Sequence, residues 1–270
     1  MPRSAPRSVR KGVFGRDPEA YDRARLRYPP RVYEILTKRC GLRPGSVVFE
    51  IGPGTGIATR ELLRLGADPI TLIEPDGRLV RFLLRSLAPV ADRIQVTHAP
   101  FERATLAAET FDLGVAATSF HWLPERQALR RVARALKPGG WWASWNNHHG
   151  EPVRASRFRE ALRPLYRRIS RGRSRGGPTP AALEREQGRH LASLASVDRF
   201  ERISREDIRW SVRLDSGQVQ ALWGTFSDIV TLPPPTRRWF LRELGVVVDE
   251  QFGGRVEVPI YTPMYTARRR

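Results

Sequence analysis

The sequence predicts an α/β protein in which helices flank a mostly parallel β-sheet. Between residues 46 and 147, short apolar runs alternate with helical patterns about every 20–25 residues, which indicates repeated β-α-β units. A glycine-rich turn, EIGPGTG at 50–56, joins the first of these runs to a helical pattern. The length of 270 residues suits one such domain with an insertion, and 40% hydrophobic residues can fill a large core.

The N-terminal region is predicted to contain a tail and two helices. Residues 1–15 are basic and carry no apolar stretch, so we expect a disordered tail. Asp17 can cap a helix that begins at Pro18, because proline is favoured in the first turn. The prolines after Tyr28 interrupt that helix, and a second one follows and ends near Gly41. Residues 16–45 are therefore expected to form a helical cap.

The central region, 46–150, carries the repeated units. Its expected strands are VVF (47–49), ITLI (70–73), IQV (94–96), FDLGVAA (111–117) and WWASW (141–145). The helix after the first strand ends at Gly66, and the helix after the fourth strand ends at KPGG (137–140). Asp76 can cap the helix that follows the second strand. Beyond this core we expect a helical insertion at 151–199 that acts as a lid, with a mobile loop at 171–180. Residues 200–270 would complete the sheet, with strands at 208–214 and 256–267 around a helical stretch at 216–247.

The composition limits the partners and the compartment. The formal charge of +19 raises the possibility of a polyanionic partner, but only three of the 47 basic residues are lysines. Arginine in place of lysine along the whole chain favours a compositional origin. A single cysteine, Cys40, suits a reducing compartment. No apolar run is long enough to cross a bilayer, and no secretory signal precedes the first helix. We therefore expect a cytoplasmic protein without a membrane partner.

The glycine-rich turn narrows the choice of nucleotide. A phosphate-binding P-loop requires Lys followed by Ser or Thr after the last glycine, and here Ile57 and Ala58 follow Gly56. The dinucleotide pattern Gly-x-Gly-x-x-Gly fits in neither register. What remains is Glu-x-Gly-x-Gly-x-Gly, beginning at Glu50. An acid at the strand end suits a cationic amino-acid ligand such as S-adenosylmethionine, and Glu74 after the second strand can accept hydrogen bonds from a ribose diol.

Three stretches together resemble a known family. VVFEIGPGTGIATREL, ITLIEPDGRL and FDLGVAATSFHWLPERQALRRVARALKPGGWWASWNN look like the class I S-adenosylmethionine-dependent methyltransferases, of the small type 11 group. The resemblance also covers YDRARLRYP at 21–29. It implies a Rossmann-like, mostly parallel sheet of seven strands, with one antiparallel strand around 256–267.

The resemblance implies S-adenosylmethionine as cofactor and assigns residues to it. Glu50 would contact its amino group directly or through water, Glu74 would bind the ribose, and Arg25 with Tyr21 would close over the carboxylate. Many relatives carry an adenine-binding Asp where this chain has Pro100, so Phe101 would pack against adenine instead. The full cofactor-binding set is Tyr21, Arg25, Glu50, Gly52, Pro53, Gly54, Thr55, Gly56, Glu74, Pro75, Asp76, Phe101, Ser119 and Phe120.

A general base is needed only if the acceptor is protonated at the working pH. His121 is the candidate base, because it follows the fourth strand at the edge where ligands bind in open α/β sheets. It can equally shape the pocket without transferring a proton. His121, Trp122, Asn147 and His148 are the expected substrate pocket. No Cys/His cluster has metal-ligand spacing, so no metal is expected.

Three functions remain open at this stage. The first is methyl transfer to a small molecule, with the insertion as a lid. The second is methylation of a nucleic acid, in which Arg167, Arg168 and the RGRSR cluster (171–175) would contact phosphates. The third is a protein that keeps the fold and binds the cofactor without transferring methyl groups. The intact glycine turn and Glu74 favour cofactor binding in all three.

Overall fold

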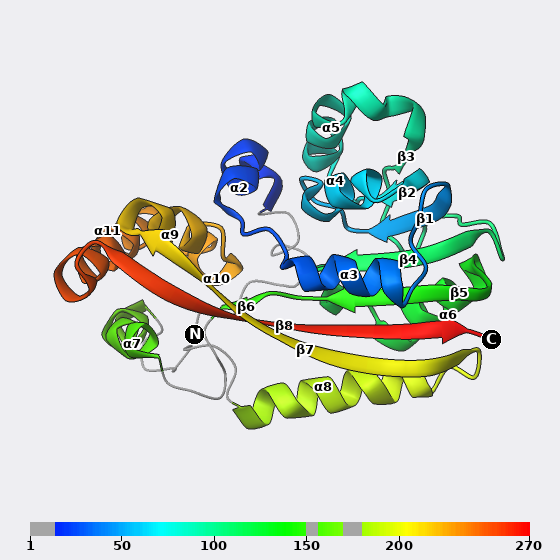
Figure 1. Ribbon diagram of the computed structural model, residues 1–270. Coiled ribbons are helices and arrows are strands. Elements are labelled where there is room, and N and C mark those ends of the chain that lie inside the picture. The colour runs from blue at the N-terminus through cyan, green and yellow to red at the C-terminus, as the bar shows by residue number, and fades with distance from the viewer. Residues whose placement is uncertain (1–13, 150–155, 170–179) are drawn as a thin grey trace. The chain divides into compact units, whose positions relative to one another are not determined.

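The structure, a computed structural model, describes residues 14–149, 156–169 and 180–270 (Figure 1). The predicted tail before Phe14 and the predicted loop at 171–180, except Pro180, lie outside these residues. The chain divides into two compact units. The helical unit comprises residues up to Leu26, His148–Arg185 and Arg209–Tyr261. The sheet unit comprises Arg27–Asn147, Glu186–Ile208 and Thr262–Arg270.

The predicted parallel sheet is confirmed. Its strands are β1 (Ser46–Ile51), β2 (Ala67–Ile73), β3 (Ile94–Thr97), β4 (Phe111–Ala117), β5 (Leu136–Trp145), β6 (His148–His149), β7 (Phe200–Asp215) and β8 (Arg255–Arg269). They follow the order β3-β2-β1-β4-β5-β8-β6, and β7 pairs with β8. The first five strands pair in parallel, whereas β8 is antiparallel to β5, with Trp141 opposite Arg268. The predicted antiparallel strand near the C-terminus is thus present.

The expected number of strands was wrong. Within the described residues the sheet has eight strands rather than seven. One that the sequence does not predict is β6, in which His148 and His149 pair with Tyr261 and Ile260. A strand of two residues is too short to show an alternating side-chain pattern in the sequence, because only its backbone hydrogen bonds define it. Strand β7 also begins at Phe200, earlier than the predicted start at 208.

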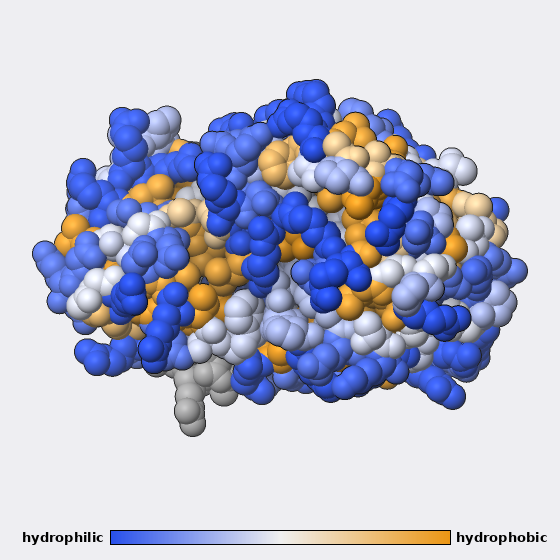
Figure 2. Space-filling view, turned by 45° about the horizontal axis from the view of Figure 1, so that its top comes forward, coloured by the Kyte–Doolittle hydropathy of each residue, from blue (hydrophilic) through white to orange (hydrophobic). Residues whose placement is uncertain are grey.

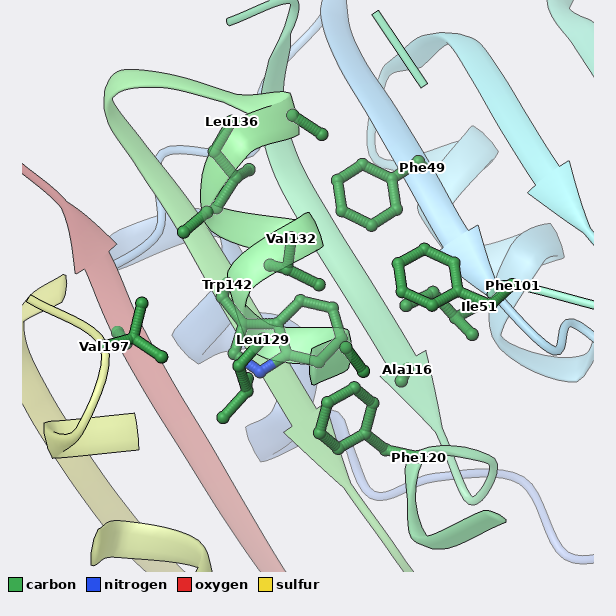
Figure 3. Packing of buried hydrophobic residues seen from close by; sticks show 14 of the residues in the cluster. Phe49, Ile51, Phe101, Ala116, Phe120, Leu129, Val132, Leu136, Trp142 and Val197 are labelled. Atoms are coloured by element: carbon green, nitrogen blue, oxygen red, sulfur yellow. The ribbon is translucent and has the colours of Figure 1, made fainter. Parts of the chain in front are cut away.

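Helices flank the sheet as predicted (Figure 1). The sheet unit contains α3 (Pro30–Lys38), α4 (Ile57–Arg64), α5 (Gly77–Ser86), α6 (Glu125–Ala135), the second half of α8 (Pro180–Ala195), and the 3-10 turns η2 (Ala88–Arg93) and η3 (Phe120–Trp122). In Figure 3, Leu129 and Val132 of α6 lie against Trp142 of β5, beside Phe49 of β1. These residues are at most 1% exposed and form the centre of the core. The core therefore fixes the strand ends from which the site is built.

The helical unit has a separate core. The helices of this unit are η1 (Phe14–Arg16), α2 (Pro18–Ala24), α7 (Arg157–Ile169), α9 (Ser216–Trp223), α10 (Ser227–Val230) and α11 (Pro234–Phe252). Phe158, Phe240 and Leu244 are buried at its centre. Asp17 caps α2 as predicted, because its Oδ1 accepts a hydrogen bond of 2.9 Å from the Ala20 amide. None of the helices in the described ranges combines the length and the apolar character of a transmembrane segment.

Candidate functional site

The glycine-rich turn lies at the carboxyl ends of β1, β2 and β4. Gly52 follows β1, and its amide donates to the Ile73 carbonyl of β2 at 2.9 Å. Its φ is +66°, and a Cβ at this position would lie 2.7 Å from the Ser119 Cβ after β4. Ser119 in turn donates from its Oγ to the Ile51 carbonyl. Only glycine fits where these strand ends converge, so the turn is locked against the sheet.

Gly54 occupies a different environment at the tip of the turn. Its φ is +62°, and a Cβ built there would meet no atom within 4 Å. The tip therefore faces open space. The Gly54 amide donates to Glu74 Oε2 at 3.1 Å, and the Asp76 amide donates to Glu74 Oε1 at 3.0 Å. Glu74 thus ties the turn to the end of β2, while each oxygen retains a lone pair for another donor.

Burial strongly perturbs Glu74. Its side chain is only 4% exposed. Burial raises the pKa of Glu74 to about 7, and the two backbone hydrogen bonds oppose that rise. Neighbouring Asp76 behaves differently. Burial would raise its pKa, but hydrogen bonds and charge from Arg78 together lower it. Asp76 also caps α5, with its carboxylate paired to Arg78 at 2.7 Å.

Glu50 lies deeper than Glu74. It is 0% exposed, and Thr59 Oγ1 of α4 donates to its Oε2 at 2.6 Å. Burial raises the pKa of Glu50 to about 7, against the effect of the Thr59 hydrogen bond. Its Oε1 and the Oγ1 of Thr55 are both buried and have no hydrogen-bond partner within the described part of the chain. Leaving such buried polar atoms without partners is costly, so both oxygens are suited to accept hydrogen bonds from a ligand.

Two residues expected to contact the cofactor lie in the core instead. Phe101 is 2% exposed and Phe120 is 6% exposed, and both belong to the cluster drawn in Figure 3. Arg131 of α6 stacks over the Phe101 ring, 5.6 Å from its centre. Little of either ring is left for adenine. The sequence pattern misses this because an aromatic residue after a strand can turn toward the core as readily as toward a ligand.

The expected substrate residues divide between the units. His121 and Trp122 lie in η3 at the end of β4, with ring centres 4.9 Å apart, and His121 is exposed. Asn147 follows β5, and its Oδ1 accepts a hydrogen bond of 2.8 Å from Thr262. These three residues belong to the sheet unit. His148 lies in β6 of the helical unit, where burial lowers its pKa to about 4.

Tyr21 and Arg25 are brought together in the helical unit. The Arg25 guanidinium lies over the Tyr21 ring, 5.1 Å from its centre. The glycine turn belongs to the sheet unit. Their predicted contact with the cofactor carboxylate therefore stays a prediction.

Sequence reasoning missed a polar cluster beside Ser119. The Tyr28 hydroxyl lies 3.0 Å from Thr118 Oγ1, and the Tyr28 ring meets Trp145 edge-on at 5.6 Å. Thr118 has a φ of +58°, the left-handed conformation that non-glycine residues seldom adopt outside functional or tightly constrained sites. Its amide donates to the Trp145 carbonyl at 2.8 Å. Tyr28 stands in the YDRARLRYP stretch, which could have directed attention to it, whereas Thr118 carries no sequence signal.

The structure places a glycine turn at the carboxyl edge of a parallel sheet, with buried acids at the ends of the first two strands. This is the arrangement that the resemblance to the class I methyltransferases implies. The described residues bring no three His, Cys, Asp or Glu side chains together as a metal site.

Comparisons with known proteins also indicate a methyltransferase domain. Residues 49–144 match the family model of the methyltransferase domain. An uncharacterized methyltransferase of Mycobacterium tuberculosis is 31% identical over 127 residues, which cover 47% of this chain and 49% of that protein. A type II methyltransferase structure from Anaeromyxobacter dehalogenans shares the fold with a TM-score of 0.62 and 18% identity, covering 91% of this chain and 97% of that one.

A second solved structure carries a ligand related to the cofactor. Phosphoethanolamine N-methyltransferase 2 of Haemonchus contortus, in complex with S-adenosylhomocysteine, has a TM-score of 0.56 and 13% identity, covering 94% of this chain and 57% of that one. Residues 49–144 therefore match a methyltransferase domain, which supports the resemblance to the class I S-adenosylmethionine-dependent methyltransferases. The chain spans about half the length of the curated relatives it matches.

Proposed function

We propose that the protein transfers a methyl group from S-adenosylmethionine to a small-molecule acceptor. The observation that carries the proposal is Glu74, which is buried at the end of β2 and bonded to the Gly54 amide. A carboxylate fixed there can accept hydrogen bonds from both hydroxyls of a ribose without moving. The open space beyond Gly54 gives the methionine part of the ligand room above the turn.

The buried oxygens around the turn fit this ligand. Among the described residues, Thr55 Oγ1 and Glu50 Oε1 have no hydrogen-bond partner, and an ammonium group offers up to three N–H donors. Glu50 is fully enclosed, so its contact with that ammonium would run through a water rather than directly. A cation nearby favours the ionised carboxyl, which offsets the cost of burying Glu50.

When bound, S-adenosylmethionine supplies a methyl group on a positively charged sulfur. The task of the chain is then to place an acceptor atom in line with that methyl group. The core-anchored strand ends hold the turn, Glu74 and Ser119 rigidly for this purpose. His121, exposed in η3, is our candidate for accepting a proton from a hydroxyl acceptor.

Calorimetric titration with S-adenosylmethionine and S-adenosylhomocysteine tests the cofactor. Saturable binding of both is expected, with no binding of NAD. Glu74→Ala should abolish it, whereas Glu61→Ala, on the exposed side of α4, should leave it unchanged. If the wild-type protein binds neither compound, the proposal fails. Transfer of labelled methyl groups to candidate acceptors then tests the reaction.

A further inference from the structure

A cation in the helical unit has no counter-charge among the described residues. Arg25 caps the C-terminal end of α2, and its guanidinium also lies 5.4 Å from the centre of the Phe226 ring, before α10. No carboxylate pairs with Arg25 among the residues that the structure describes. Two aromatic rings therefore position a partly buried guanidinium whose hydrogen-bond donors remain available. Planar oxyanions such as carboxylates match those donors in pairs.

A second polar group shares the same aromatic ring. His149 of β6 lies 4.7 Å from the Phe226 ring centre and 6.3 Å from that of Trp223. Its Nε2 is shielded from solvent and has no hydrogen-bond partner within the described residues. Burial, with a smaller effect from the Arg25 charge, lowers the pKa of His149 to about 3. The ring is thus neutral at pH 7 and can donate a single hydrogen bond from Nε2.

Trp223 completes the aromatic wall. It is 5% exposed, and its Nε1 donates to the Tyr166 hydroxyl at 3.1 Å. Phe158 meets its ring edge-on at 5.6 Å. The Trp223 ring is therefore held in one orientation beside Phe226, with its polar atom already satisfied. Trp223 thus supports the neighbouring Phe226 ring, which stays partly exposed.

We propose that Arg25 and His149 bind the carboxylate of a small-molecule ligand within the helical unit, with the partly exposed Phe226 ring against its planar apolar body. One guanidinium balances one negative charge, and the neutral imidazole adds one hydrogen bond, which favours a carboxylate over a dianionic phosphate. This site lies within the helical unit, and the inference does not depend on the proposed function. It gives Arg25 a role different from the one expected from the sequence, in which Arg25 contacts the cofactor.

Binding of benzoate, measured by tryptophan fluorescence in the presence of S-adenosylhomocysteine, tests the site. Benzoate should saturate, benzamide should bind at least about tenfold more weakly, and phenyl phosphate should also bind more weakly. Arg25→Met and His149→Phe should each weaken benzoate binding, the former by about tenfold or more. Arg23→Met, an exposed change on the same helix, should not. S-adenosylhomocysteine affinity should be the same in His149→Phe and Arg23→Met as in the wild type.

Several results would overturn the inference. Equal binding of benzamide and benzoate would leave only an aromatic surface, and tighter phenyl phosphate binding would replace the carboxylate by a phosphate. Loss of S-adenosylhomocysteine affinity in Arg25→Met, with benzoate binding intact, would assign Arg25 to the cofactor instead. Failure of the cofactor proposal is separately visible, because the wild-type protein would then not bind S-adenosylhomocysteine while benzoate could still be titrated alone.

Discussion

At the scale of single residues, the site depends on two acids that the fold shields from water. Glu50 and Glu74 both lie beneath or beside the glycine turn, and burial raises the pKa of each to about 7. In the protein without ligand, ionising either carboxyl near neutral pH costs free energy, since water no longer stabilises its charge. A site built this way is poised for a cationic ligand, and it should reveal itself in the pH dependence of stability.

Glu50→Gln should remove part of that dependence. The folded-state pKa of about 7 exceeds the ordinary value of 4.5, so the folded protein binds the Glu50 proton more tightly than the unfolded chain. The resulting stabilisation is full below pH 4.5 and is lost as the pH rises through 7. Urea unfolding at pH 5 and pH 8 should show Glu50→Gln gaining about 2–3 kcal/mol relative to the wild type over that interval. If the difference in unfolding free energy between Glu50→Gln and the wild type were the same at pH 5 and pH 8, Glu50 would not be desolvated.

Two glycines in the same turn should respond differently to alanine. Gly52→Ala would force a Cβ to within 2.7 Å of Ser119 Cβ and should lower the stability measurably. Gly54→Ala points into open space and should cost only about 1 kcal/mol for its positive φ. It should nevertheless weaken S-adenosylmethionine binding, because its methyl group enters the ligand space. Thermal melts and calorimetry on both variants measure these effects, and a folded Gly54→Ala with unaltered affinity would contradict the placement of the ligand.

At the scale of elements, His190 joins α8 to the sheet. Its Nε2 lies 3.1 Å from Ser144 Oγ of β5, and its Nδ1 is paired with Glu125 at the start of α6. The Tyr265 ring of β8 lies 4.2 Å away. The order Ser–His–Glu is that of a hydrolytic triad, but Ser144 is 4% exposed within β5. We interpret the group as a structural link, since it joins β5, α6 and α8.

His190→Ala should therefore destabilise the protein without affecting cofactor binding. Removing the ring breaks a part-buried hydrogen bond and the contact with Glu125 and leaves a space beside Tyr265, which should cost about 2–4 kcal/mol. His98→Ala, at an exposed position after β3, is the matched control and should change the stability by less than about 0.5 kcal/mol. Denaturant unfolding decides the matter. Equal stability of both variants would rule out the link.

At the scale of the whole molecule, the dominant property is charge. The chain carries 47 basic and 28 acidic residues. Some arginines are neutralised locally, as where Arg31 and Arg39 both pair with Glu206 at 2.6 and 2.9 Å. Hydrophilic residues cover most of the face in Figure 2. The large hydrophobic residues exposed in the described ranges are Leu84 and Val246.

This charge should produce weak, salt-sensitive binding to any polyanion. Association with a single-stranded RNA probe should fall steeply between 50 and about 300 mM salt, because it depends on displaced counterions. S-adenosylmethionine affinity should hardly change over the same range, since Glu50 and Glu74 are buried away from the ions. Filter binding and calorimetry provide the two measurements. RNA binding that persists at high salt would favour a nucleic-acid acceptor over the small molecule proposed here.

Local patterns explain why much of this molecule could be predicted from its sequence. Strand β4 has the predicted bounds, 111–117, because a buried parallel strand is a continuous apolar run. The glycine turn and Glu74 follow from spacing within one β-α-β unit. The contacts of Tyr28 with Thr118 and of Thr262 with Asn147 could not be predicted, because each joins single polar residues distant in the chain. The burial of Phe101 depends likewise on how α6 packs, which no local pattern records.

The antiparallel strand β8 has a consequence for how the protein acquires its structure. Strand β5 pairs in parallel with β4 but meets its other neighbour, from Met264 to Arg268, only near the far end of the chain. Closing such distant pairings is slow. Until β8 docks, one edge of β5 presents unpaired amides and carbonyls, together with Trp142 and Trp145 side chains that are later buried. During refolding, β8 and a second molecule therefore compete for the unpaired edge of β5. Dilution slows the second reaction and should improve the yield of folded protein.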